Sequence, residues 1–564
     1  MSSESWLDSS GLARRLEQGT RKLLTTSRFS AAGGSKGSCV GIKLIKMSRL
    51  FLTKRLCASC PALSWTPRSG KRSVFLQPHR RYARRSGSAS GGRHRASSWV
   101  WMCGGVGLGA AVAVGLKYRR EAVDSSCAGE VAGEFSAAIR VSRDLVQRAK
   151  DEVGAPGLVV GVSVDGVQVW CEGIGYADLE NRVPCGPETV MRIASISKPL
   201  TAAAAARLCE EGKLDLDAPV RKYVPEFPQK QFDGQDVTIT SRMILSHLSG
   251  IRHYEKDAQK VKKDKKKAQR LLKPPVKEKE DEKKLSESTT EQNTRGKGAT
   301  QSEFEHEEYY LKENFESVTQ ALDLFKDDPL IFKPGTTFLY STHAFTLLGA
   351  VMEQAAGQRF LDIMRNMFRE LGMLNTLADE NDRIIYHRSR YYRLNKRGHI
   401  VNCPYVDNSY KWAGGGFLST VGDLLLFGNA LLYSYQVAHL KDTKDVQPGF
   451  LKPKTAIDLW APVDRTEGSW DTDGMYAQGW LVVEKLQKYG QCRKRRHYVS
   501  HTGVAVGASS VLLVLPVEER DQCQGQRPVL PQGVVVTIIT NMQSVGLNST
   551  ALKIAHEFDK ARCL

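Results

Sequence analysis

The first residues that could do chemistry are Ser195 and Lys198, which lie three residues apart at the start of an expected helix. That spacing places both side chains on one helix face. A serine needs a base before it can act as a nucleophile, and a neutral Lys198 would accept its proton. The helix N-terminus would place the Ser195 N–H beside a developing oxyanion. Ser-x-x-Lys also arises by chance about once in a few hundred residues, so the pair alone could equally be a surface helix cap.

A second motif carries a phenol and a hydroxyl. Tyr340-Ser-Thr342 follows Phe332-Lys-Pro-Gly, a turn that leads into an apolar helix expected over 345–355. The simpler interpretation is a tyrosine packed at a helix start, so this motif also indicates little by itself.

Two further motifs lie nearer the C-terminus. His501-Thr-Gly503 ends an expected strand and is followed by Val504. The segment that begins at Trp412 is a Gly-rich loop leading into a helix. Because this loop lacks phosphate-loop spacing, a tight turn with a helix N-cap explains it without a ligand.

Taken in order, Ser195 with Lys198, Tyr340, and His501-Thr-Gly503 resemble the three signature motifs of serine beta-lactamases and DD-peptidases. The resemblance spans residues 141–558. It implies an α+β fold of the beta-lactamase/transpeptidase type. In that fold an antiparallel sheet is flanked by helices, an all-helical lobe packs beside it, and the active site lies in the cleft between them. The flanking sequences agree, namely Leu245-Ser-His-Leu-Ser-Gly-Ile, Phe332-Lys-Pro-Gly and Gln478-Gly-Trp480.

The resemblance also implies a role for each motif residue. Ser195 would be acylated, Lys198 would accept or hold its proton, and Tyr340 would relay that proton to the leaving group and activate water. Whether Lys198 or the Tyr340 phenolate is the primary base stays open. The remaining residues implied to act in the site are His501 as a catalytic residue, the backbone N–H groups of Ser195 and Val504 as the oxyanion hole, and Thr342, Thr502 and Gly503 as substrate-binding residues.

The motifs depart from the family pattern at three positions. Thr342 stands where the family has asparagine, so a hydroxyl replaces a carboxamide that would contact a substrate amide. His501 stands where most beta-lactamases have lysine. If a charged His501 positions a substrate carboxylate, activity should fall as the pH rises through roughly 6–7.5. Val504 keeps an N–H but adds a β-branched wall to the cleft.

The net charge of +20 belongs to the N-terminal region. Residues 1–120 carry 23 Lys and Arg against three acidic residues, whereas the remaining residues carry 58 of each sign. A nucleic-acid groove would need its basic patch on the folded part, which is balanced. We therefore expect no nucleic-acid partner.

Residues 1–98 predict a basic extension that contains a mitochondrial transit peptide, because 18–98 are rich in Arg and Ser and contain no acidic residue. A short basic amphipathic pattern starts at Met47, and the alternative is a disordered basic tail. The apolar Gly/Ala-rich run over 99–116 is about long enough to cross a bilayer. As a sorting signal or membrane anchor it would place the folded part in the intermembrane space, in association with the inner membrane.

Hydrophobic periodicity predicts one folded domain over 121–564, whose first and last strands share one antiparallel sheet. A Lys/Glu-rich stretch over 255–308 has too few apolar residues to fold and predicts a flexible insertion, part of which could be a solvated charged helix. We expect helices over 133–152, 195–209, 235–249 and 550–560, and strands over 158–164, 168–171, 497–502, 509–515 and 533–539.

The other candidate ligands predict neither a metal nor a cofactor. His247 and His253 lie six residues apart, which suits no zinc pair, so we interpret both as structural. The cysteines from Cys127 to Cys563 have no zinc or redox spacing and are expected to be free thiols.

The leading hypothesis is hydrolysis of a peptide or ester through an acyl-enzyme on Ser195. The resemblance extends to the mitochondrial members of the family in animals, which implies a homo-oligomer or filament and an influence on lipid metabolism. The alternative is a filament-forming structural protein of the intermembrane space with little catalysis.

Overall fold

The computed structural model describes residues 133–272 and 306–563, apart from short gaps at 441–442, 445, 467–470, 472–473, 489–492 and 518–528. The expected transit peptide, the apolar run over 99–116 and most of the charged insertion lie outside these residues. No helix in the described part is long and apolar enough to cross a membrane.

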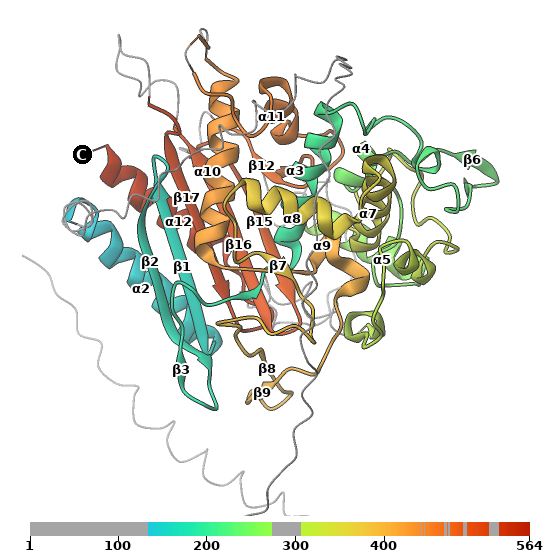
Figure 1. Cartoon of the computed structure of the whole chain (residues 1–564). Coiled ribbons are helices and arrows are strands. Elements are labelled where there is room, and N and C mark those ends of the chain that lie inside the picture. The colour runs from blue at the N-terminus through green and yellow to red at the C-terminus, as the bar shows by residue number, and fades with distance from the viewer. Residues whose placement is uncertain are drawn as a thin grey trace, which may run out of the picture. The chain divides into compact units, whose positions relative to one another are not determined.

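Eight strands form one antiparallel sheet in the order β11–β12–β15–β16–β17–β1–β2–β3 (Figure 1). The first strand, β1, pairs with the last, β17, so the prediction that the two ends of the domain share a sheet is confirmed. Asp165 and Gly166 both have positive φ, at 48° and 83°, and close the β1–β2 hairpin. The strands are β1 (Gly157–Val164), β2 (Val167–Asp178), β3 (Val183–Pro184), β11 (Gly474–Tyr476), β12 (Leu481–Val483), β15 (Tyr498–Ala505), β16 (Ala508–Pro516) and β17 (Gly533–Thr540).

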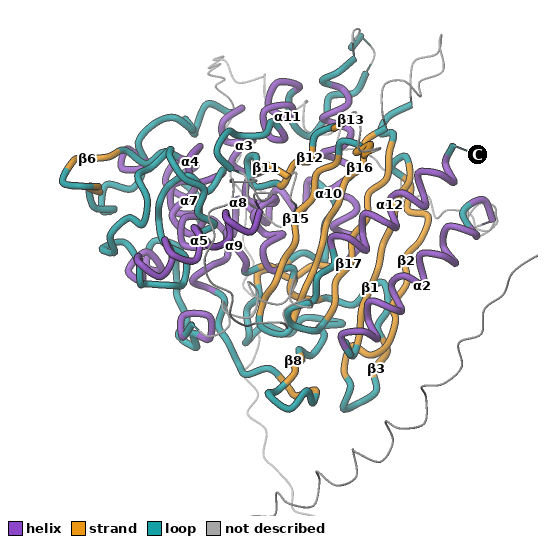
Figure 2. Tube along the Cα trace, turned by 180° about the vertical axis from the view of Figure 1, so that it is seen from behind, coloured by secondary structure: helices purple, strands orange, loops and turns teal. Residues whose placement is uncertain are grey.

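Helices cover both faces of this sheet, and β1 and β17 are therefore buried along their whole length. Helices α2 (Ser136–Val153) and α12 (Asn548–Arg562) pack on one face, which Figure 2 shows from the front. Helix α10 (Val421–Val437) packs on the opposite face. Alternate residues of β1 contact the two layers, with Val160 facing α2 and α12 and Val159 facing the side of α10.

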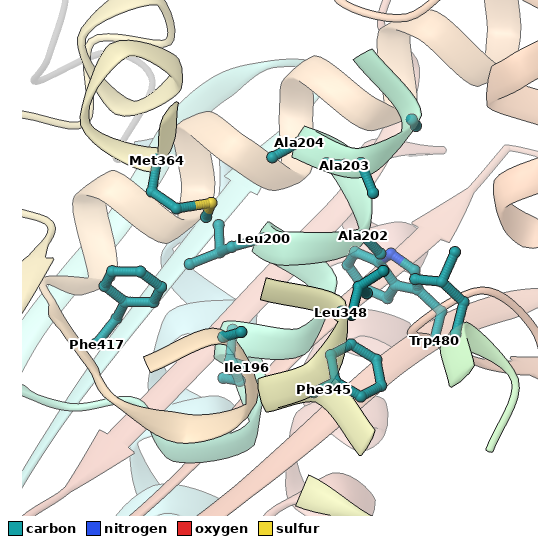
Figure 3. Close-up of a cluster of buried hydrophobic side chains, with 14 of the residues drawn as sticks. Ile196, Leu200, Ala202, Ala203, Ala204, Phe345, Leu348, Met364, Phe417 and Trp480 are labelled. Atoms are coloured by element: carbon teal, nitrogen blue, oxygen red, sulfur yellow. The ribbon is translucent and has the colours of Figure 1, made fainter. Parts of the chain in front are cut away.

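The remaining helices form a lobe beside the α10 face, built around α3 (Ser197–Glu210). Its five consecutive alanines, at 202–206, favour a helix and let other helices approach closely. Figure 3 shows Ala202, Ala203, Ala204 and the nearby Leu200 among Phe345, Leu348, Met364 and Trp480. The helices of the lobe are α4 (Ser241–Leu245), α5 (Ala258–Leu272), α7 (Thr342–Ala356), α8 (Phe360–Glu370), α9 (Trp412–Gly415) and α11 (Pro453–Trp460).

Short strands and single helical turns complete the described part. One three-stranded sheet joins β4 (Met191–Arg192), β10 (Phe417–Ser419) and β7 (Leu377–Ala378), directly before the Ser195 turn. The two-stranded ribbons are β5 (Lys230–Phe232) with β6 (Gln235–Val237), β8 (Tyr392–Leu394) with β9 (Ile400–Asn402), and β13 (Leu486–Lys488) with β14 (Arg493–Arg495). The 3-10 turns are η1 (Ala194–Ile196), η2 (Val220–Lys222), η3 (Glu307–Tyr310), η4 (Gln320–Leu324) and η5 (Ser409–Lys411).

The prediction of one helix over 235–249 is wrong. Residues 235–237 form strand β6, and the helix that follows, α4, is only five residues long. The Thr240 hydroxyl caps α4 by accepting from the Met243 N–H at 3.3 Å. The chain then leaves the helix at His247, which has φ 58°, because the carbonyls of His247 and Leu248 accept from the backbone of residues 339 and 335. Tertiary pairing therefore overrides the local apolar pattern.

Helices α5 and α2 each add a detail to the predicted organisation. The described start of the charged insertion is the helix α5, which corresponds to the charged-helix alternative for that part. In α2 the buried positions after Phe135 are Ala138, Ser142 and Val146, and Leu145 is only partly buried, so these positions form the core-facing stripe of the helix. The five cysteines that the structure describes are free thiols.

Replacement of Phe558 by alanine tests the packing of α12. The Phe558 ring is fully buried and stacks 5.9 Å from Phe135 and 6.1 Å from Trp170, thereby joining α12, α2 and β2. Phe558→Ala should lower the free energy of unfolding by about 3–5 kcal/mol, as measured by urea denaturation. Leu374→Ala, at a side chain 66% exposed, is the control and should change little. Equal effects of the two substitutions would contradict this packing.

Candidate active site

Ser195 lies in the turn η1, between strand β4 and helix α3. Its neighbour Ala194 has φ 49°, which is unfavourable for a residue with a Cβ and persists only where the surroundings hold it. Two contacts hold the turn, since the Ile193 N–H donates to the Phe417 carbonyl at 3.1 Å and the Ser510 hydroxyl donates to the Ile193 carbonyl at 2.7 Å. Ser195 is partly exposed whereas the residues on both sides are buried, so its hydroxyl faces an accessible space.

Lys198 is fully buried one turn further along α3. Its Nζ lies 3.2 Å from the Ser195 Oγ, 3.3 Å from the Thr342 Oγ1 and 2.7 Å from the Gly414 carbonyl oxygen. These oxygens come from η1, α7 and α9, so the amine joins three segments that are far apart in the chain. The expected helical face of Ser195 and Lys198 is thus present, with Thr342 as a third member.

Tyr340 precedes α7, whose N-cap is the Ser341 hydroxyl. The Lys198 Nζ lies 4.6 Å from the centroid of the Tyr340 ring, and the ring itself is half-buried. The structure therefore brings the hydroxyl, the amine and the phenol into one site.

Strand β15 approaches the Ser195 turn at Gly503. A Cβ at this position would lie 2.3 Å from the Ile193 carbonyl oxygen and 3.0 Å from the Ser195 nitrogen, so only glycine allows this contact. The next residue, Val504, accepts at its carbonyl from the Tyr309 hydroxyl at 2.8 Å. Because the N–H and C=O of one strand residue point to the same edge, the Val504 N–H also points away from β16. Its part in an oxyanion hole remains a prediction.

His501 is fully buried on β15. The Tyr476 hydroxyl lies 2.8 Å from Nε2, and Nδ1 lies 2.7 Å from the Thr502 carbonyl oxygen. A carbonyl only accepts, so Nδ1 carries the proton and Nε2 accepts from Tyr476. Burial, reinforced by the nearby Lys198 charge, lowers the pKa of His501 to about 3. The expectation of a charged His501 that binds a carboxylate and titrates near pH 6–7.5 is therefore wrong.

Several residues of this site were missed from sequence. Tyr476 and Ser510 contact His501 and the Ser195 turn through side chains that lie in otherwise ordinary strands. The Gly414 carbonyl belongs to the Gly-rich loop, whose close packing against Thr342 explains its glycine. Tyr476 lies two residues before the family-like Gln478-Gly-Trp480, and this proximity was the one feature of the sequence that could have indicated its place in the site.

The segment after the charged insertion also reaches the site, through a buried ion cluster. Arg252 donates to Glu308 at 2.8 and 3.0 Å, and His343 Nε2 lies 2.9 Å from the same carboxylate. His253, interpreted as structural, accepts at Nδ1 from the Thr342 N–H at 3.3 Å. Among the residues that the structure describes, no three His, Cys, Asp or Glu side chains form a metal site.

Comparison with known proteins agrees with this geometry. Residues 143–555 match the Beta-lactamase family, and the chain belongs to that family. In the described part, the serine, lysine and tyrosine that mark the family's motifs lie together, as the distances above show.

Within the family, the chain is 58% identical over 449 residues to the mitochondrial serine beta-lactamase-like protein LACTB of Mus musculus, covering 76% of this chain and 81% of the mouse protein. It is 59% identical over 443 residues to the protein of the same name from Homo sapiens, with the same coverage.

Solved structures show the same fold at low sequence identity. EstCE1, described as a hydrolase with promiscuous acyltransferase activity, superposes with a TM-score of 0.53 at 21% identity, over 76% of this chain and 98% of that one. The octameric penicillin-binding protein homologue from Pyrococcus abyssi gives a TM-score of 0.52 at 20% identity, over 73% of this chain and 76% of that one. The predicted fold class is confirmed.

The lowered pKa of His501 predicts a specific acid sensitivity. The unfolded chain binds a proton at this histidine below about pH 6.5 and the folded protein does not until about pH 3, so stability present above pH 6.5 is lost as the pH falls. In the wild type this histidine should lower the free energy of unfolding by up to about 1.4 kcal/mol for each pH unit below 6.5, and His501→Gln should abolish that contribution. Urea unfolding at pH 6.5 and pH 5 measures the difference. Exposed His399→Gln is the matched control. An unchanged pH slope in His501→Gln would show that His501 is not held neutral.

Proposed function

We propose that this protein is a serine hydrolase that forms an acyl-enzyme on Ser195. The observation that carries the proposal is the buried amine of Lys198, held 3.2 Å from the Ser195 Oγ. A serine within hydrogen-bond reach of a base, with the base oriented by further groups, is the arrangement of an activated nucleophile.

The contacts of Lys198 suit both of its protonation states. A charged amine has three N–H donors, and Ser195 Oγ, Thr342 Oγ1 and the Gly414 carbonyl provide three acceptors. A neutral amine keeps two N–H groups for Thr342 and Gly414 and turns its lone pair to the serine hydroxyl. Lys198 therefore accepts the proton from Ser195 without a change of partners.

In the proposed acylation, the Ser195 Oγ attacks the carbonyl carbon of the substrate and its proton passes to Lys198. The substrate oxygen, now negative, is stabilised by the N–H groups of Ser195 and Val504. Tyr340 passes the proton to the leaving group as the carbon–leaving-group bond breaks. Water then attacks the acyl carbon, gives up a proton by the reverse relay, and releases the acid and Ser195.

The substrate class is an ester or peptide, and the charge of the site favours an uncharged acyl group. A neutral His501 provides no cation where most beta-lactamases have lysine. Thr342 hydrogen-bonds to Lys198, so its hydroxyl takes part in holding the amine. The mitochondrial name of the mammalian relatives, together with the basic N-terminal extension, supports a mitochondrial location for the chain. Within mitochondria we propose the intermembrane space, on the apolar run over 99–116.

Labelling with a fluorophosphonate probe tests the nucleophile. The wild-type protein should form a covalent adduct and Ser195→Ala should form none, because the probe reacts with an activated serine. Lys198→Met should slow labelling at least about 100-fold, since it removes the proton acceptor. Ser549→Ala in α12, on the far side of the sheet, is the matched serine control and should label as wild type. Adducts of equal yield in wild type and Ser195→Ala would remove the assignment.

A second function, self-assembly into a homo-oligomer or filament, is supported by a surface observation. Ile384 and Tyr386 lie in one loop and are 87% and 82% exposed, so both large side chains are accessible to a second molecule. We propose that this loop contacts a second copy of the chain.

Replacement of both side chains by serine tests that contact. The double variant should sediment as a smaller species than the wild type at the same concentration, because the apolar contact is lost. Ser195→Ala, which leaves the loop intact, should sediment as wild type. Identical sedimentation of the double variant and the wild type would contradict the proposed contact.

A further inference from the structure

His247 contacts the backbone on both sides of Tyr340. Its carbonyl oxygen accepts from the Leu339 N–H at 2.8 Å, and its Nδ1 accepts from the Ser341 N–H at 3.1 Å. One residue therefore holds the N–H groups of the residues directly before and directly after Tyr340. Neighbouring residues strengthen the same contact, since the Arg252 carbonyl accepts from the Ser341 hydroxyl at 2.7 Å.

The His247 ring also packs directly on the phenol. Its centroid lies 4.3 Å from that of Tyr340, 4.8 Å from Tyr476 and 5.3 Å from Phe345. The side chain is fully buried, and its Nε2 has no hydrogen-bond partner among the described residues. A buried ring nitrogen without a partner is costly, so this histidine is not explained by hydrogen-bonding capacity alone.

The backbone of His247 is in the left-handed region, with φ 58°. This residue ends α4, because its N–H donates to the Ile244 carbonyl at 3.0 Å and the Leu248 N–H donates to the Met243 carbonyl at 2.7 Å. This conformation lets the carbonyl and the ring of one residue face the same stretch of chain.

The protonation state of the ring follows from its contacts. Because Nδ1 accepts from a backbone N–H, the neutral ring carries its proton on Nε2. A second proton, on Nδ1, would point at the Ser341 N–H, so that two N–H donors would face each other and the hydrogen bond would be lost. Burial and the nearby Lys198 charge lower the pKa of His247 well below its usual range, which keeps this contact intact.

We propose that His247 is a positioning residue that holds Tyr340 in the geometry needed for proton transfer between Ser195, Lys198 and the leaving group. It touches neither substrate nor reacting atoms and acts through Tyr340. The inference rests on the proposed function, because positioning the phenol affects turnover only if its hydroxyl takes part in the reaction.

Two substitutions separate the hydrogen bond from the ring. Asparagine places its Oδ1 near the position of Nδ1 and tolerates positive φ, whereas alanine loses the acceptor and disfavours that φ. With p-nitrophenyl acetate in stopped flow, His247→Ala should lower the acylation rate about 10- to 100-fold with KM little changed, as expected for a small displacement of a reacting group. His247→Asn should stay within about threefold of wild type because it keeps the acceptor.

A double-mutant cycle with Tyr340→Phe distinguishes positioning from a general effect on the fold. Without the phenol hydroxyl there is nothing to position, so His247→Ala should lower the acylation rate of the Tyr340→Phe variant by less than about twofold. Equal losses in the two backgrounds, or a loss in His247→Asn as large as in His247→Ala, would overturn the proposal.

The contact itself is measured without turnover. Hydrogen exchange of the Ser341 amide, which loses its side-chain acceptor, should accelerate in His247→Ala and stay slow in His247→Asn. Unchanged exchange in both variants would also overturn the proposal. Fluorophosphonate labelling of Ser195 in the same preparations reports the proposed function separately. Absence of Ser195-dependent labelling in the wild type would contradict that function. Normal labelling, combined with equal losses of acylation rate on His247→Ala with and without the Tyr340 hydroxyl, would contradict only the role of His247.

Discussion

The site depends on the burial of one amine. Moving an amine out of water is costly unless its hydrogen bonds are replaced, and Lys198 replaces them with oxygens from three separate segments. The Ser195 turn, the start of α7 and the Gly-rich loop must therefore meet at one point whenever the amine is buried. The same contacts that satisfy Lys198 also define where Ser195 and Tyr340 lie, so stability and reactivity share one set of interactions.

Close backbone approach is the second constraint. Gly503 lets strand β15 lie against the Ser195 turn, and Gly414 lets α9 lie against Thr342. At Gly503 a Cβ would clash with main-chain atoms of the Ser195 turn, and at Gly414 it would clash with the Thr342 side chain. Gly503 thus brings the sheet close to the Ser195 turn, and Gly414 brings two helices of the lobe close together.

Sequence reasoning was effective where the information is local or carried by motif order. The strands expected over 158–164 and 168–171 lie within β1 and β2, and the grouping of Ser195, Lys198 and Tyr340 followed from the order of their motifs. It failed at residues 235–249, because backbone pairing with residues 335–341 decides that segment. The neutrality of His501 could not be predicted either, since it results from burial beside a lysine 303 positions earlier.

The neighbouring positions of β1 and β17 have a consequence for how the domain is made. The centre of the sheet joins residues near 160 with residues near 538, so its middle is absent until almost the whole polypeptide is available. Strand pairings this distant in sequence form slowly, because the entropy of closing a long loop is lost before the contacts between the strands stabilise the pair. A chain shortened at its C-terminus would leave the edge of β1 bare and prone to aggregate, rather than yield a smaller working domain.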